Sequence, residues 1–102
     1  MTAAPRPAPD RLLTDPARLA IMSVLCSVDW CDFAFLRGSV GLSETALSRH
    51  LDALNGSAYQ RRERLGRSPR ISVHATDAGR DRFHHHVEGL HELAEHTPPA
   101  SS

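Results

Sequence analysis

The basic residues of this chain are gathered where they could bind a polyanion. The 102-residue sequence carries twelve basic and twelve acidic residues, so its formal net charge is zero. Residues 43–82 nevertheless hold eight arginines against five acids, a balance of +3. Residues 61–70 are the densest part, with one acid and five arginines: Arg61, Arg62, Arg64, Arg67 and Arg70. Such a cluster can bind the phosphates of a nucleic acid, but a charged strand edge that only prevents aggregation has the same composition.

A second group of candidate residues lies on a predicted helix over residues 43–55. Ser43 is a strong N-cap, and a glycine follows the predicted end. The apolar residues have helical spacing and should form the buried stripe: Leu47, Leu51 and Leu54. The opposite face is polar, and its short side chains, Thr45 and Ser48, would let the helix backbone approach a major groove. Arg49 is long enough to reach a guanine edge or a phosphate.

The remaining patterns predict the elements that position these residues. Good N-cap residues precede four helical patterns: Asp15, Asp32, Ser43 and Thr76. The predicted elements are, in chain order, a helix from residue 16, a short strand within 28–31, a brief helix after 32, the helix of 43–55, a hairpin with arms at 59–65 and 70–75 and its turn at 66–69, and a last helix from 77. This order predicts a mainly α-helical fold with a small β-hairpin, in which a helix-turn-helix is followed by a wing.

The chain is long enough for one domain only, since 102 residues cannot enclose two separate cores. Proline-rich ends without bulky side chains predict disordered tails over residues 1–9 and 97–102, which leaves a domain at 10–96. No apolar run approaches the roughly 20 residues of a membrane span. The first residues lack the apolar segment of a signal peptide. We therefore expect a cytoplasmic protein.

Three parts of the sequence carry a family resemblance: GLSETALSRHLDAL at 41–54, GRSPR at 66–70 with TDAGR at 76–80, and RLAI at 18–21. In these parts the chain is similar to the recognition helix, the wing with its junction to the last helix, and the opening of the first helix of one family. From residue 10 to about residue 94 it resembles the small winged helix-turn-helix transcriptional regulators of the MarR/ArsR type. The likeness is to compact bacterial members that consist of little more than the DNA-binding domain.

The resemblance implies a homodimeric, sequence-specific regulator of transcription, repressor or activator, that binds a near-palindromic operator in double-stranded DNA; we expect a repressor. The helix of residues 43–55 would enter the major groove, and the Arg-rich wing of residues 59–75 would lie on the backbone or in the minor groove. The resemblance also assigns roles by residue: Thr45, Ser48 and Arg49 at base edges, Ser43 and His50 nearer phosphates, and Arg67 and Arg70 in the wing.

The last predicted helix carries an apolar stripe that a small monomer could not fully cover: Phe83, Val87, Leu90 and Ala94. Pairing with a second copy would bury this stripe, with help from Leu12 or Leu13, so the terminal helices would form the dimer interface. Two modules held about 34 Å apart would read half-sites one helical turn apart. The alternative is that the stripe packs against the chain's own first helix.

Five of the seven histidines lie in the last twenty residues and raise the question of a metal site. The candidate ligands share a helical face with Asp81 and Glu95 and could hold an ion across a dimer: His84, Glu88 and His91. The three consecutive histidines at 84–86 point in three directions, however, and histidines on a polar helix ordinarily face solvent. We therefore expect no metal cofactor.

The two cysteines are too few for a disulfide scaffold and lack the close spacing of a metal–thiolate site. Cys26 falls on the buried face of its helix, where a thiol behaves as a small hydrophobe. A redox role for Cys26 or Cys31 stays open. So do an unidentified small-molecule effector, lodged between the dimer helices and the DNA-reading part, and regulation by abundance alone.

Other functional classes fit the sequence less well. It has no phosphate-binding loop, no nucleophile elbow and no His-Glu-x-x-His motif, so we expect no enzyme. A winged-helix module that binds protein rather than DNA stays an alternative, since a fold does not determine a function. The second alternative is a metal-responsive regulator that uses histidines of the last helix. The charge of +3 around the helix and the wing favours DNA, which steeply salt-dependent retention on duplex DNA would test.

Overall fold

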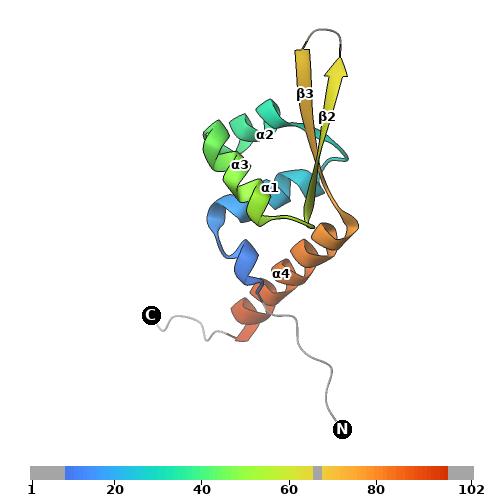
Figure 1. Ribbon diagram of the computed structural model, residues 1–102. Helices are drawn as coiled ribbons and strands as arrows, with labels where there is room; N and C mark the ends of the chain where they lie inside the picture. Colours follow the sequence, from blue (N-terminus) through green and yellow to red (C-terminus); the bar gives the residue numbers. More distant parts are fainter. Residues whose placement is uncertain (1–8, 66–67, 97–102) are drawn as a thin grey trace.

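The helices and strands of the described part of the chain surround a small core, with a long hairpin projecting from it (Figure 1). The structure is a computed structural model that describes the backbone of residues 9–65 and 68–96 and the side chains of residues 9–57 and 71–95. The elements are η1 (Arg11–Leu13), α1 (Pro16–Cys26), β1 (Cys31–Asp32), α2 (Phe33–Val40), α3 (Glu44–Ala53), β2 (Ala58–Leu65), β3 (Ser68–Ala75) and α4 (Asp77–His96). The predicted mainly α-helical fold with a β-hairpin is confirmed. The predicted tails lie outside the described residues, apart from residue 9.

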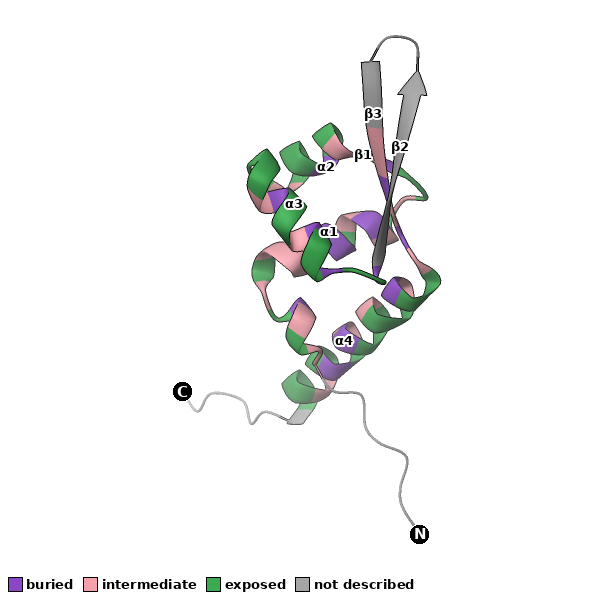
Figure 2. Cartoon of the chain, in the orientation of Figure 1, coloured by how far each residue is buried: buried purple, intermediate pink, exposed green. Residues whose placement is uncertain are grey.

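Helix α1 forms the centre of the core. Its N-cap is Asp15, as predicted, and the carboxylate accepts hydrogen bonds from the backbone N–H groups of Ala17 at 2.8 Å and Arg18 at 3.2 Å. Pro16 takes the first helical position, where a missing N–H costs nothing. Three α1 side chains have no exposed surface: Ile21, Met22 and Leu25. Helices α2, α3 and α4 and strand β3 all contact α1, and Figure 2 shows buried residues on the helices around it.

Helices α2 and α3 form the predicted helix-turn-helix. Helix α2 ends at Val40, and its C-cap residue Gly41 has a φ of 68°, in the left-handed region that glycine adopts without strain. Helix α3 begins after Ser43, whose hydroxyl accepts a hydrogen bond from the Ala46 N–H at 3.1 Å. The buried side of this unit consists of leucines from both helices and the turn after α3: Leu36, Leu47, Leu51 and Leu54. The leucine stripe predicted from helical spacing is therefore correct.

The sheet has the strand order β1-β3-β2, and both pairings are antiparallel. Strand β1 contributes two pairs only, Cys31 with Val73 and Asp32 with Ser72. The short strand was expected within residues 28–31 and lies nearer the α2 end, because Cys31 is the residue that turns into the core opposite Val73. Strand β3 begins at Ser68, within the segment predicted as the turn.

The junction between the hairpin and α4 is held by close backbone contacts. The Thr76 hydroxyl donates to the Gly56 carbonyl at 2.6 Å and accepts from the Gly79 N–H at 3.0 Å, which caps α4 as predicted. A Cβ on Gly79 would lie 1.9 Å from the carbonyl oxygen of Ser57, so only glycine fits there. Arg80 donates hydrogen bonds to the carbonyls of Leu25 and Cys26 at the end of α1 and, at 2.9 Å, to that of Val28 in the loop that follows. The start of α4 is thereby fixed to both α1 and the segment that follows α3.

Candidate nucleic-acid interface

Helix α3 separates its residues into a buried face and an exposed polar face. Leu47 has no exposed surface and Leu51 only 3%. The predicted base-reading residues, Thr45, Ser48 and Arg49, are all exposed, as is the cap residue Ser43. Because α3 is anchored through its leucines, its polar side chains face outward without contributing to the core. This is the arrangement that a helix needs in order to enter a groove of DNA.

Four of the five predicted α3 residues line one hollow of about 390 Å³, together with Ala46: Ser43, Thr45, Arg49 and His50. Ser48 is exposed on the same helix but does not line the hollow. His50 is half-buried and lies close enough to Asp15, the N-cap of α1, to interact with its charge. The pKa of Asp15 is lowered, mainly by the hydrogen bond from the Arg18 N–H, and His50 adds to this effect. His50 thus lies between the exposed face and the body of the domain.

The exposed face of α3 is not basic. It carries one arginine, Arg49, together with the exposed acids Glu44 and Asp52. Within the part of the chain whose side chains are described, no carboxylate forms an ion pair with Arg49, so its guanidinium is available to a ligand. A helix of this charge can distinguish bases but adds little to the attraction of a phosphate backbone. That attraction would have to come from another element.

The hairpin carries the arginine cluster on its two strands. The backbone register pairs Arg61 with Ser72, Arg62 with Ile71, Glu63 with Arg70 and Arg64 with Pro69. The side chains of Arg61, Arg62, Arg64 and Arg70 lie outside the described residues, and so does the whole of Arg67. Their predicted contacts with DNA therefore stay predictions. Strands β2 and β3 project past the helices of the domain (Figure 1).

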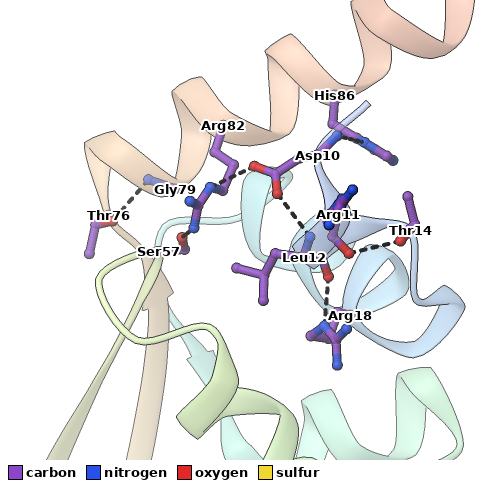
Figure 3. A network of polar contacts seen from close by, with 10 residues as sticks. All are labelled: Asp10, Arg11, Leu12, Thr14, Arg18, Ser57, Thr76, Gly79, Arg82 and His86. Atoms are coloured by element: carbon purple, nitrogen blue, oxygen red, sulfur yellow. Dashed lines mark hydrogen bonds and ion pairs between the residues drawn. The ribbon is translucent and has the colours of Figure 1, made fainter. Parts of the chain in front are cut away.

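A polar network that the sequence did not reveal joins the first described residues to α4 (Figure 3). The carboxylate of Asp10 pairs with Arg82 at 2.7 Å, and the Asp10 N–H donates to Nδ1 of His86 at 2.8 Å. Arg82 also donates to the hydroxyl of Ser57 at 3.1 Å. His86 is 1% exposed, so the expectation that these histidines face solvent is wrong for this one. It lies three residues after Phe83 on the inner face of α4, a spacing that could have identified it.

The apolar stripe of α4 faces two environments. Phe83 is half-buried and packs against the chain's own core, in line with the alternative considered for the stripe. Farther along, Leu90 and Leu93 keep 41% and 54% of their surface exposed. Val87 and Leu12 are half-buried, and Ala94 is exposed. Leu13, which was expected to assist pairing, has no exposed surface and belongs to the core of the protomer.

The two thiols and the predicted metal ligands of α4 form no cluster among the residues that the structure describes. Burial raises the pKa of Cys26, and burial together with the charge of Asp32 raises that of Cys31, so both thiols are protonated and weakly nucleophilic at neutral pH. Of the metal candidates, His84, Glu88 and His91 are exposed on α4. The described residues of a single chain contain no group of three or more His, Cys, Asp or Glu placed to hold an ion. Among the same residues, no helix has the length and hydrophobicity needed to cross a bilayer.

The sequence comparison decides the family. The model of the winged helix DNA-binding domain matches residues 17–94, which run from the first turn of α1 almost to the end of α4. The chain belongs to the family of winged helix DNA-binding domains. The predicted resemblance to small winged helix-turn-helix regulators of the MarR/ArsR type is thereby confirmed, and α3 and the β2–β3 hairpin lie where the prediction placed the recognition helix and the wing. None of the curated proteins matches the sequence significantly.

Solved structures of other proteins share the fold of this winged-helix protein. A transcriptional regulator homologue from Pyrococcus horikoshii OT3 is 24% identical over 84% of this chain and 87% of its own, with a TM-score of 0.78. A MarR-family regulator from Silicibacter pomeroyi is 28% identical over 80% of this chain and 59% of its own, with a TM-score of 0.50. NadR in complex with 4-hydroxyphenylacetate is 17% identical over 82% of this chain and 63% of its own, with a TM-score of 0.67. The winged-helix protein thus spans less than two thirds of the last two chains.

Proposed function

We propose that this winged-helix protein is a homodimeric repressor of transcription that binds a near-palindromic operator in double-stranded DNA. The observation that carries the proposal is the exposed polar face of α3, anchored by buried leucines and set in a winged helix DNA-binding domain. Helix α3 enters the major groove with Thr45, Ser48 and Arg49 at base edges, and with Ser43 and His50 toward the phosphates.

Specificity and affinity come from different elements in this proposal. The α3 face has one arginine beside two acids, so it reads bases but attracts DNA weakly. The hairpin has five arginines and one acid between residues 61 and 70, and it supplies the phosphate or minor-groove contacts. Each phosphate contact releases counterions, which makes the affinity fall steeply as salt rises.

A second copy of the chain supplies the second α3 helix that a near-palindromic operator requires. Leu90 and Leu93 are large apolar side chains that the monomer leaves 41% and 54% exposed on the far half of α4. Fully burying a side chain of this size contributes about 1.5–3 kcal/mol, so covering the part of each leucine that is still exposed contributes roughly half of that. Pairing through α4 would cover them and set two α3 helices about 34 Å apart, one turn of the duplex. Sedimentation of the protein as a monomer at micromolar concentration would contradict this part of the proposal.

The test compares two arginine variants on duplex DNA. An operator is first selected from a random pool, and its affinity is then measured against salt concentration for the wild type, Arg49→Ala and Arg11→Ala. Arg11 is exposed on η1 and belongs to neither α3 nor the hairpin, so its variant removes the same charge and should bind like the wild type. Arg49→Ala should lose about 1–3 kcal/mol on the operator and less on random duplexes.

Two results would change the proposal. An equal loss on operator and random DNA would assign Arg49 to phosphate contact rather than to base reading. A wild-type protein that binds no duplex, or binds without a salt slope, would favour the alternative of a module that recognises another protein.

A further inference from the structure

A hollow lies at the root of the hairpin, where the edge strand β1 meets α2. It has a volume of about 440 Å³ and shares no residue with the hollow on α3. Its lining comes from the loop after α1, from β1, from α2 and from β3: Val28, Trp30, Cys31, Asp32, Phe35 and Ser72. These residues have no role in the DNA binding proposed for α3.

The walls of this hollow are aromatic and stay open to solvent. Phe35 keeps 63% of its surface exposed and Trp30 keeps 38%. Trp30 is held in place by His74, whose ring stacks on it with centroids 4.4 Å apart and an angle of 20° between the planes. A domain this small gains stability by covering large apolar side chains, so two neighbouring exposed rings around one hollow are typical of a binding site.

The described residues that line the hollow include one charged side chain, the carboxylate of Asp32. Asp32 is the N-cap residue of α2, but its side chain accepts no hydrogen bond from the first turn of that helix, unlike Asp15 and Ser43 at the other caps. Its exposed carboxylate lies on the hollow instead. Cys31 is the other ionisable lining residue, and its pKa is raised by burial and by the charge of Asp32, so it stays neutral. Among the residues whose side chains are described, no arginine or histidine lines the hollow.

We propose that this hollow binds a small organic cation with an apolar or aromatic body. A carboxylate beside two aromatic rings is the chemistry that recognises such ligands, because the charge pairs with the carboxylate and the cation is attracted to the ring faces. Asp32 supplies the charge, and Phe35 and Trp30 supply the rings. An anionic aromatic ligand of the same size would be repelled by Asp32.

The position of the hollow gives this binding a regulatory consequence, which rests on the proposed function. Asp32 pairs with Ser72 on β3, the strand that carries the wing, while Phe35 belongs to α2, the helix that precedes α3. A ligand that touches all three residues would hold the wing at one angle to the recognition helix. The ligand would change the affinity for DNA only if this angle differs from the angle that the wing adopts in the DNA complex.

The test uses the intrinsic fluorescence of Trp30, the only tryptophan of the chain, and needs no DNA. Benzyltrimethylammonium is titrated into the full chain at neutral pH, with phenylacetate as the anionic counterpart. We expect a saturable change of emission with the cation and none with the anion. Absence of a saturable change up to about 10 mM benzyltrimethylammonium, or an equal response to phenylacetate, would overturn the proposal.

Variants then locate the binding. Asp32→Asn keeps the shape and a good cap residue but removes the charge, and it should weaken binding of the cation about tenfold or more. Asp32→Ser is a second neutral cap in case the first variant folds poorly. Asp29→Asn is the matched control, since Asp29 is exposed nearby but does not line the hollow. Equal binding by all three variants would refute the site, whatever the protein does with DNA.

The same test also reveals whether a side chain of this chain takes the place of the ligand cation beside Asp32. Arg61 pairs with Ser72 from the other side of β3. If its guanidinium neutralised Asp32 in solution, the wild-type chain would not bind benzyltrimethylammonium, and the proposal would fail.

Discussion

Replacement of Gly79 by alanine should destabilise the protein, although alanine is the better helix former. A Cβ at this position would meet three backbone atoms of Ser57, the nearest at 1.9 Å, and contacts below 3.0 Å are not sustained. The two segments would have to separate by about 1.1 Å, the difference between 3.0 and 1.9 Å. Backbone atoms cannot turn aside as the end of a flexible side chain can. The separation would also break the hydrogen bond of 3.1 Å from the Thr76 N–H to the Ser57 carbonyl.

The expected cost follows from these terms. Overpacking costs about 1–3 kcal/mol, and the lost hydrogen bond adds about 1 kcal/mol. The helix propensity of alanine returns up to about 1 kcal/mol. The net destabilisation is therefore about 1–4 kcal/mol, and each kcal/mol lowers the melting temperature of a domain this size by roughly 4–8 °C.

Gly38→Ala is the matched control for this prediction. Gly38 lies in α2, its φ is negative, and a Cβ there would meet no atom within 4 Å. The same substitution should therefore stabilise the protein, by about 0.5–1 kcal/mol. Urea denaturation at one protein concentration, followed by circular dichroism, measures both variants. Two shifts of the same sign would refute the assignment of Gly79 to a close backbone approach.

Three further predictions concern the polar contacts that hold the helices. Arg80→Met leaves carbonyls at the end of α1 without their donors, and thermal unfolding should show a loss of about 2 kcal/mol. His86→Leu leaves the Asp10 N–H unpaired and should cost about 1–3 kcal/mol more than His86→Asn, whose side-chain oxygen can still accept; hydrogen exchange at residues 10–13 measures the difference. The pKa of Asp15 is lowered on folding, so its stabilisation is complete above the ordinary value of 3.8 and is lost as the pH falls through the folded-state pKa. The advantage of the wild type over Asp15→Ala should therefore be present at neutral pH and disappear in acid, as measured by urea midpoints.

These three predictions fail in different ways. Equal exchange in the two His86 variants would mean that its nitrogen does not hold η1. An Arg80 variant as stable as the wild type would mean that water replaces the guanidinium at the end of α1. A pH-independent difference for Asp15→Ala would mean that the cap acts through shape rather than through charge.

Local signals in the sequence predicted most of the fold. Cap residues such as Asp15, Ser43 and Thr76 act on N–H groups two or three positions away, so their effect can be read without knowing the rest of the structure. The leucine stripe of α3 could be predicted equally well, because residues three or four positions apart lie on the same face of a helix. The polar face opposite that stripe, and with it most of the candidate site, followed directly.

Contacts between distant residues could not be predicted in this way. Asp10 and His86 are 76 positions apart, and neither residue signals the other locally. A run of three histidines on a polar helix gives no sign that one of them is buried. The hollow at the hairpin root likewise depends on the pairing of β1 with β3, which brings together residues about forty positions apart.

The far half of α4 has an evolutionary consequence. Among the described residues beyond His86, no α4 side chain belongs to the hydrophobic core, whereas α3 is anchored inside it. In the proposed function, the choice of a partner copy by α4 and the choice of a DNA sequence by α3 therefore reside in separately mutable segments. After a gene duplication, two descendants could cease to pair with each other and still recognise one operator, or keep pairing while their operators diverge, and neither path would require the domain to be rebuilt.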